Sequence, residues 1–490
     1  MKNPLAPSAG KRARRGADWV QVPTIDHEQH DGLPLPRRRV AYISLAIALA
    51  MAVLDGQIAN TALPAIARDL HASPTASIWV VNAFQLAVTA TLFTFASLGG
   101  LKGPARVYRL GVIGFILGSL FSALSRSLPE LIAARVLQGI GASAIMSLSP
   151  ALLRDIFPSS QLGRALGLNA LVVGTAAAAG PTVGGLLLSV ASWPILFAVN
   201  VPLGLANVVL NRALPDDRRN EGNLDIPSAI SSALGFALTI YGLDGFAHNQ
   251  PPAAIALPLT IGLVSGWYFV RRQFRLARPL IALDLFRISS FAIASAASLA
   301  TFTAQGLAYI TLPFFFQIAL GRTPLQSGLL LSAWPLSTAF VAPIAGRLSD
   351  RYPVGILATS GLAILTIGLA LYATLPPNPS TAEIVTRAMI CGVGFGFFQS
   401  PNTREILGTA PREKTTSASG ILAALRVTGQ TLGAALVAIV FGVFGAHAVA
   451  GEGAARDAVI RAVPAALTLA AWCAGLATAA SGLRLLRRPR

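Results

Sequence analysis

The chain contains one long apolar segment after another, separated by short breaks rich in Arg, Pro and Gly. A helix that crosses a bilayer takes roughly 20 mostly apolar residues, and we expect about fourteen such helices. Their apolar cores begin near residues 40, 77, 107, 130, 164, 193, 226, 253, 291, 325, 354, 384, 417 and 462. Because 54% of the 490 residues are hydrophobic and only 12% are charged, no soluble core could bury this apolar surface. The sequence therefore predicts an all-α integral membrane protein.

Successive loops differ in charge. Most of the 38 Lys and Arg residues lie in the two tails and in every second loop, for example at Lys102, Arg154 and Arg347, whereas the other loops hold few, for example Arg126 and Arg322. Because Lys and Arg are enriched in cytoplasmic loops, we expect both termini in the cytoplasm. A nucleic-acid-binding protein would instead gather a net charge such as +18 on one folded face. We therefore expect membrane lipid, and no nucleic acid, as a partner.

Two segments resemble each other: "ELIAARVLQGIGASAIMSLSP" from residue 130 and "EIVTRAMICGVGFGFFQSP" from residue 383. Each runs from an acid through an arginine and paired glycines to a proline. Parallel duplication is typical of transporters, whose solute site lies where the two halves meet. We predict six-helix bundles at residues 40–213 and 291–483, two inserted helices with linkers at 214–290, and basic tails at 1–39 and 484–490. Chance similarity between Gly-rich hydrophobic segments is the alternative.

Asp55 lies near the middle of the first apolar segment, in "AMAVLDGQIANTALPAIARDL". A carboxylate at such a depth costs roughly 2.5 to 3.5 kcal/mol on insertion scales, so it needs a partner or a proton. Desolvation favours the neutral form of an acid, which would allow a proton to be loaded and released in each cycle. Asp55 is therefore the candidate proton-coupling group. The alternative is a structural acid that is permanently bonded to neighbouring donors.

Arg135 lies early in the fourth segment, with Gln138 and paired glycines close behind. A guanidinium keeps its charge, so it must face the bundle interior, a water-filled cavity or an acid. Arg135 could therefore modulate Asp55 as the two approach and part. Alternatively, it anchors the helix end by extending to the membrane interface.

The fifth segment carries "GTAAAAGPTVGG" at residues 174–185. Pro181 removes a helix hydrogen bond, and glycines allow a neighbouring backbone to approach closely. We expect a tightly packed, kinked helix at a moving seam, formed by Gly174, Gly180, Pro181, Gly184 and Gly185. Ordinary packing of small residues is the alternative.

The loop "GRLSDRYPVG", residues 346–355, is a candidate cytoplasmic gate. It contributes Gly346, Asp350 and Arg351. Asp350 would favour the positive end of the next helix, and Arg351 could pair across the seam. Solvated loop charges are the alternative.

Several polar side chains lie within the apolar segments, and with phenylalanines they could line a central cavity for amphiphilic solutes. Each could equally bond one helix to another. The polar members are Gln57, Asn60, Asn82, Gln85, Gln138, Gln305, Gln317, Gln399, Asn402 and Arg426, and the aromatic members are Phe84, Phe302, Phe315 and Phe398. Asp244, in the predicted insert, is a second and weaker candidate for a buried functional acid.

Other energy sources and chemistries lack their sequence signatures. The chain has no G-x-x-x-x-G-K-[ST] loop for ATP, its five histidines show no metal-ligand spacing, and no nucleophile, base and orienting group occur together. We expect no cofactor, no metal and no enzyme activity. An ion gradient is the remaining source of energy.

These residues resemble the major facilitator superfamily, and within it the fourteen-helix drug:proton antiporter family. "LDGQIANTALP" is similar to the family's first-helix pattern L-D-x-T-[IV]-[VA]-N-x-A-L-P, "RVLQGIGA" to R-x-x-Q-G-x-G-A, and "FAVNVPLG" to F-x-x-N-V-P-x-G. "GTAAAAGPTVGG" is similar to the antiporter motif G-x-x-x-G-P-x-x-G-G, with Ala176 at the leading glycine. The resemblance runs from about residue 40 to 485. It implies a major facilitator fold, a proton-carrying Asp55 and a functional Arg135.

The first-half loop departs from the family pattern G-x-L-x-D-R-x-G-R-[RK]. Gly100 stands at its acid and Leu101 at its first basic residue, so the N-terminal latch is either weakened or completed by other basic residues such as Lys102 and Arg106.

The resemblance implies a proton-coupled antiporter that exports amphiphilic or drug-like small molecules across the cell inner membrane. Export of one specific endogenous metabolite or siderophore is the alternative, and a transport-inactive sensor or scaffold is a remote one. Some exporters of this kind work with a periplasmic adaptor and an outer-membrane channel, which the resemblance adds as candidate partners.

Overall fold

The computed structural model describes residues 32–215, 224–248, 250–276, 279–376, 378–411, 414–445 and 452–486. These residues form helices and short connections, without a strand. Most of the predicted N-terminal tail (1–31), the end of the C-terminal tail (487–490) and part of the predicted linker (216–223) lie outside the described residues.

Fourteen helices of this part of the chain are long and apolar enough to cross a membrane. The expected number is confirmed, and so is the all-α membrane fold. The first span begins at Leu35 rather than near residue 40, and the last at Arg456 rather than near 462. Hydropathy marks the apolar core of a helix, whereas the helix itself continues into the polar flanks.

The helices before the predicted insert make up six spans, two of which are broken in two. Pro74–Lys102 is divided at Ile78 and Ile195–Ala213 at Val199. The elements are α1 (Leu35–Asp69), α2 (Pro74–Ser77), α3 (Trp79–Lys102), α4 (Pro104–Leu124), α5 (Leu128–Ile156), α6 (Leu162–Val190), α7 (Ile195–Ala198) and α8 (Asn200–Leu210), with short 3-10 turns at Ser159–Gln161 and Asn211–Ala213.

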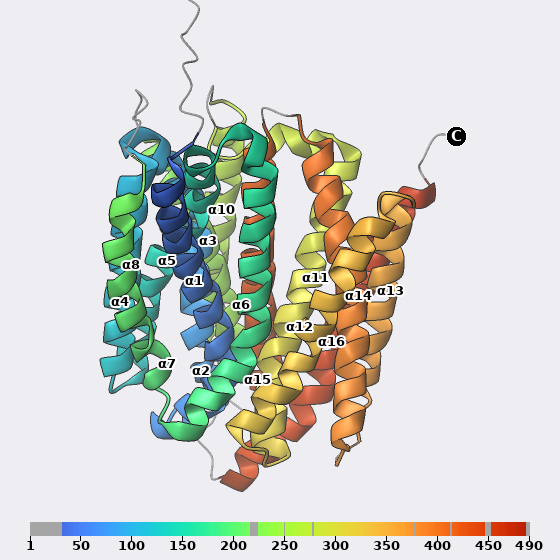
Figure 1. Cartoon of the computed structure of the whole chain (residues 1–490). Helices are drawn as coiled ribbons and strands as arrows, with labels where there is room; N and C mark the ends of the chain where they lie inside the picture. Colours follow the sequence, from blue (N-terminus) through green and yellow to red (C-terminus); the bar gives the residue numbers. More distant parts are fainter. Residues whose placement is uncertain are drawn as a thin grey trace, which may run out of the picture.

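The remaining helices follow in eight spans. They are α9 (Ile226–Ala247), α10 (Pro252–Gln273), α11 (Ser289–Phe314), α12 (Pro324–Leu348), α13 (Val354–Ala373), α14 (Thr381–Thr409), α15 (Thr415–Val443) and α16 (Glu452–Leu486). A 3-10 turn at Leu283–Arg287 precedes α11, and a π-helical turn at Phe315–Ala319 extends it. The start of α1 and the end of α16 lie at the same end of the bundle (Figure 1).

The inserted helices α9 and α10 pack against each other, and α9 also packs against α3 and α15. The pair therefore contacts a helix from each side of the insert. The division into two bundles with the boundaries given above stays a prediction.

The two similar sequence segments make the same packing contacts. In α5, a Cβ atom added to Gly139 would lie 2.5 Å from the Phe84 carbonyl oxygen of α3, and one added to Gly141 would lie 2.3 Å from the Phe115 nitrogen of α4. In α14, the glycines of "CGVGF" approach the backbones of α12 and α13 at 2.2 and 2.4 Å. Each glycine pair thus allows one helix to pack closely against two others.

Helices α6 and α12 meet at the end of the bundle opposite the chain termini. In Figure 1 they lie close together at their lower ends and separate toward the top. Residues of the second half of α6, among them Pro181 and Gly185, are buried against the first half of α12. At the other end, Leu166 and Leu171 of α6 and Phe340 of α12 are exposed. The close backbone contacts between α6 and α12 therefore lie at the end away from the termini.

Candidate functional site

Asp55 lies at the centre of a buried hydrogen-bond network that joins three helices. The Arg135 Nη1 of α5 donates to Asp55 Oδ2. Gln138 Nε2 of α5 donates to Asp55 Oδ1 over 2.8 Å, and Asn200 Nδ2 of α8 donates to the same oxygen over 2.9 Å. Asp55 is 2% exposed, and Arg135 and Gln138 are fully buried. Since an ionised carboxylate only accepts hydrogen bonds, these three donors match the charged form of Asp55.

Two nitrogens of the Arg135 side chain donate hydrogen bonds, and two aromatic rings lie near it, whereas its buried Nη2 has no partner among the described residues. Its Nε donates to the Val80 carbonyl oxygen over 3.0 Å, and its Nη1 donates to Gln138 Oε1 over 2.5 Å. The guanidinium carbon lies 4.2 Å from the ring centre of Phe84 and 5.3 Å from that of Phe197, within the range of cation–π attraction. Arg135 therefore lies in the bundle interior, beside the acid with which the sequence pairs it, and not at the membrane interface.

Gln138 and Asn200 complete the network in ways the sequence does not show. Gln138, a predicted cavity residue, bonds Asp55 and also donates to Ser119 Oγ of α4 over 2.8 Å. Asn200 was not among the predicted site residues. Its signal was the asparagine within "FAVNVPLG", at the break between α7 and α8.

We expect Asn200→Leu to lower the stability of the protein by about 1.5 to 3 kcal/mol, because a buried carboxylate loses one of its donors. Unfolding of the purified protein in detergent, followed by intrinsic fluorescence, measures the change. In an Asp55→Asn background the same substitution should cost much less. An equal cost in both backgrounds would show that Asn200 acts independently of Asp55.

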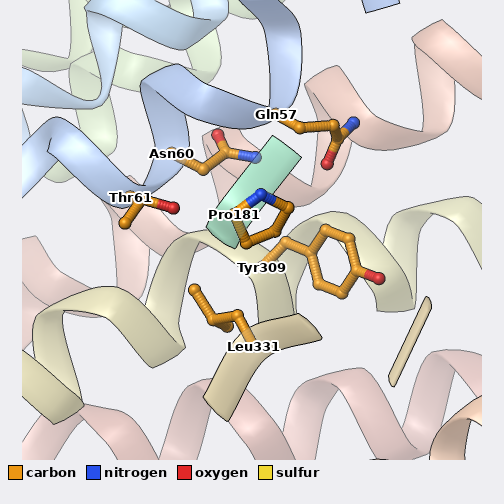
Figure 2. A pocket seen from close by; sticks show the side chains of 6 residues that line it. All are labelled: Gln57, Asn60, Thr61, Pro181, Tyr309 and Leu331. Atoms are coloured by element: carbon orange, nitrogen blue, oxygen red, sulfur yellow. The ribbon is translucent and has the colours of Figure 1, made fainter. Parts of the chain in front are cut away.

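A small pocket lies where helices from the two sides of the seam meet (Figure 2). Its lining residues are Gln57, Asn60 and Thr61 of α1, Pro181 of α6, Tyr309 of α11 and Leu331 of α12. The cavity among them has a volume of about 10 Å³, far below the roughly 300 to 1,000 Å³ typical of sites for drug-sized ligands. In this conformation the pocket is the closed floor of the seam rather than a full solute site.

The proton-site candidate and the pocket lie on different faces of α1. At 100° per residue, Gln57, Asn60 and Thr61 point roughly 120° to 160° away from Asp55 around the helix axis. Asp55 accordingly contacts α5 and α8, whereas the pocket residues face α6, α11 and α12. A solute in the pocket and a proton on Asp55 would influence each other through α1.

The other predicted cavity residues fall into two groups. Some bond one helix to another: Gln317 donates to the Thr61 carbonyl oxygen over 2.8 Å, Asn402 to Ser298 Oγ over 2.8 Å, and Gln430 to Gln305 over 3.4 Å. The second group includes Asn82 and Gln85 of α3, which are buried and have polar atoms without a hydrogen-bond partner among the described residues. Phe315 is buried and Gln399 is half-buried. Their role in a cavity stays a prediction.

The predicted hinge residues lie between α1 and α12. A Cβ atom at Gly180 would lie 2.4 Å from Gln57 Cβ, and one at Gly184 would lie 3.3 Å from Ile58 Cγ2, so both glycines face α1. Gly185 faces α12, where the Pro324 carbonyl oxygen is 2.6 Å away. Gly174 differs from the expectation, because no atom of the described residues beyond its own stretch of helix lies within 4 Å of its Cβ position. The close approaches at glycines of α6 therefore occur in its second half.

The predicted gate residues lie at the other end of α12. Asp350 forms a salt bridge with Arg404 of α14, and both side chains are more than half exposed. Arg351 is exposed, and Gly346 lies against Ser400 of α14. In the first half, Gly100 is exposed and Leu101 is half-buried. Gly103 alone joins α3 to α4, with a φ of 99° that favours glycine.

Asp244, the second acid, lies on α9 and is 5% exposed. Its Oδ2 lies 3.2 Å from Nδ1 of His248, one turn further along. It is thus separate from the Asp55 network.

Comparison with known proteins identifies the family to which this architecture belongs. The model of the Major Facilitator Superfamily matches residues 45–434. The chain belongs to this superfamily. The match begins ten residues before Asp55 and includes both Arg135 and the seam, so the residues described above lie within the family's shared fold.

The relatives of this superfamily member are transporters. The uncharacterized transporter YebQ of Escherichia coli (strain K12) is 47% identical over 420 residues, which are 85% of this chain and 92% of that protein. The riboflavin transporter RibZ of Clostridioides difficile is 30% identical over 410 residues, 83% of this chain and 89% of that protein. The multidrug efflux pump LfrA of Mycolicibacterium smegmatis is 30% identical over 419 residues, 83% of this chain and 82% of that protein.

Membership in the superfamily and in its multidrug-type family is therefore confirmed. The protein is a multi-pass membrane transporter and not an enzyme.

Proposed function

We propose that this transporter exports amphiphilic organic molecules across the cytoplasmic membrane in exchange for protons. The observation that carries the proposal is the buried carboxylate of Asp55, held by three donors from α5 and α8, on a helix whose other face lines the seam. With both termini in the cytoplasm, the seam is closed on the far side, so the protein faces inward.

A proton on Asp55 would couple to this seam through α1. Protonation neutralises the carboxylate and weakens its bonds to Arg135, Gln138 and Asn200, since a charged acceptor makes the stronger hydrogen bonds. Helix α1 is then held less tightly to α5 and α8. Because Gln57 and Ile58 pack against the glycines of α6, a shift of α1 changes the support of the α6–α12 contact. Proton binding thereby favours one of the two seam arrangements.

Two further proposals depend on the substrate and the cell. The relative named a riboflavin transporter supports transport of one specific metabolite, and export of such a metabolite is the second candidate. A periplasmic adaptor and an outer-membrane channel are the proposed partners if the exported molecule must also cross an outer envelope.

Accumulation of a dye and drug panel in cells that lack their own pumps tests the function. Expression of the wild-type protein should lower accumulation, and either a protonophore or Asp55→Asn should abolish this effect at equal membrane levels. Asp69→Asn provides the matched control, because Asp69 is an exposed carboxylate on the same helix. It should export like the wild type.

Two results would change the proposal. If Asp55→Asn exports as well as the wild type, Asp55 is a structural acid and coupling occurs elsewhere. If the wild type moves no compound of a broad panel, export of a single metabolite becomes the better hypothesis.

A further inference from the structure

Arg426 is a charged side chain inside the membrane for which the transport mechanism above has no role. It lies in the span Ser417–Val443 of α15, nine residues after its start, or about 14 Å along the helix axis. Its neighbours Ala424 and Val427 belong to an apolar cluster that includes Phe84 and Val88 of α3. As a whole residue, Arg426 is half-buried.

No described residue offsets this charge. No carboxylate of the described residues forms an ion pair with the Arg426 guanidinium. In the neighbouring network, by contrast, the positive charge of Arg135 is paired with the negative charge of Asp55. A guanidinium cannot shed its proton, and an unpaired charge inside the membrane is unfavourable and marks a functional site by default. Among the described residues, the positive charge of Arg426 therefore has no countercharge.

The face of α15 that carries Arg426 also carries polar groups. Gln430 follows one turn later, so it shares this face, and it donates to Gln305 of α11. On α3, which packs against α15, Gln85 Oε1 is buried and has no hydrogen-bond partner among the described residues, and the same holds for Gln57 Oε1 on α1. These oxygens can accept hydrogen bonds from hydroxyl or amide groups of a bound molecule.

Along the bundle axis, Arg426 lies on the side of the pocket toward the chain termini. Gly429 of α15 packs against Phe302 of α11, and Gly433 against Thr303 and Leu307, so the two helices run in the same direction. Gln305 is one turn before the pocket residue Tyr309, and Arg426 is one turn before Gln430. Arg426 therefore lies about 12 Å from the level of Tyr309, measured along the helix axis. It is displaced toward the end where α6 and α12 separate (Figure 1).

We propose that Arg426 binds an anionic group, a carboxylate or a phosphate, of the molecule that this protein exports. The guanidinium presents five N–H donors in a planar fork that matches the oxygens of these groups. The substrate class is then an organic anion with an apolar or aromatic body and hydroxyl or amide groups. This inference rests on the proposed export function, whereas its first test is a binding measurement that needs no transport.

Fluorescein and rhodamine 123 suit the binding test, because they share a xanthene ring but carry negative and positive charge respectively. The purified full chain in phosphatidylcholine nanodiscs should bind fluorescein at least tenfold more tightly than rhodamine 123, measured by fluorescence anisotropy. Arg426→Gln should weaken fluorescein binding at least tenfold and leave rhodamine 123 unaffected, while Arg426→Lys retains part of the preference. Arg271→Gln is the matched control, since Arg271 lies over Trp267 on α10.

Equal dye affinities, a preference for rhodamine 123, or no binding of either dye by the wild type would overturn the assignment. A lipid phosphate has the same chemistry as a substrate phosphate, so the measurement is repeated with phosphatidylglycerol in the nanodiscs. Fluorescein binding should not change. Competition by this lipid that disappears in Arg426→Gln would assign Arg426 to a lipid headgroup and would also overturn the proposal.

Everted membrane vesicles separate this inference from the export function. If fluorescein binds through Arg426 but no dye accumulates under a proton gradient, proton-coupled export fails while the anion site stands. If Arg426→Gln and the wild type accumulate every dye equally under the gradient, export stands and the anion site fails.

Discussion

Replacing Arg135 by methionine should destabilise the protein by about 3 to 5 kcal/mol, because the change leaves the buried carboxylate of Asp55 without its countercharge. Asp55 would keep the amide donors of Gln138 and Asn200, which do not carry charge. The loss of the contacts with Phe84 and Phe197 adds to the effect. Thermal and denaturant unfolding in detergent measure it.

A second substitution separates the charge from the packing. Arg135→Met combined with Asp55→Asn should be more stable than Arg135→Met alone, because the uncompensated charge is then removed. The exposed pair provides the comparison: Arg404→Met breaks the bond to Asp350 and should cost less than about 1 kcal/mol. Equal losses for Arg135→Met and the double variant would show that side-chain packing, and not the ion pair, determines the stability of this network.

Replacing Gly328 by alanine should open the α6–α12 seam. A Cβ atom at Gly328 would lie 2.2 Å from the Pro181 carbonyl oxygen, and this oxygen belongs to the helix backbone, so it cannot turn aside. Overpacking of this kind costs about 1 to 3 kcal/mol, which corresponds to a shift of roughly five- to 150-fold away from the closed seam. Export should fall with it, since alternating access requires both seam arrangements.

Disulfide cross-linking measures the seam directly. Thr182 Oγ1 and Ser332 Oγ are 2.5 Å apart, so cysteines at these two positions should cross-link in this conformation once Cys391 and Cys473 have been replaced. Gly328→Ala should reduce the cross-linked fraction sharply. Gly174→Ala is the matched control, because no atom surrounds that Cβ position on α6. Unchanged cross-linking in Gly328→Ala would mean that the helices adjust without separating.

The spans could be predicted from the sequence because each is determined locally by its own apolar run. The breaks within spans could not be. The division at Val199 falls within a mostly apolar run, and the division at Ile78 falls where an apolar run begins, so hydropathy marks neither as a break inside a span. Likewise, the boundaries of a helix depend on its caps, such as Thr323 with Gln326 at the start of α12.

The charged residues of the candidate site could be predicted from the sequence, whereas one of its neutral residues could not. A buried Asp55 requires a partner, and Arg135 is a cation of comparable depth on a nearby span, so elementary electrostatics associates them. Asn200 is neutral and could serve many roles, and its bond to Asp55 joins residues 145 positions apart. Gly328 gave no signal either, because its function depends on the backbone of α6, which is distant in the sequence.

The unpaired charge of Arg426 has an electrical consequence. Exchange of one outgoing monovalent anion for one incoming proton moves two charges across the membrane in the same electrical sense. At a potential of 100 mV, negative inside, each contributes about 2.3 kcal/mol, so the two together drive export on the order of a thousandfold. A transporter built around Arg426 would therefore continue to work when the pH gradient is small, provided that the membrane stays polarised.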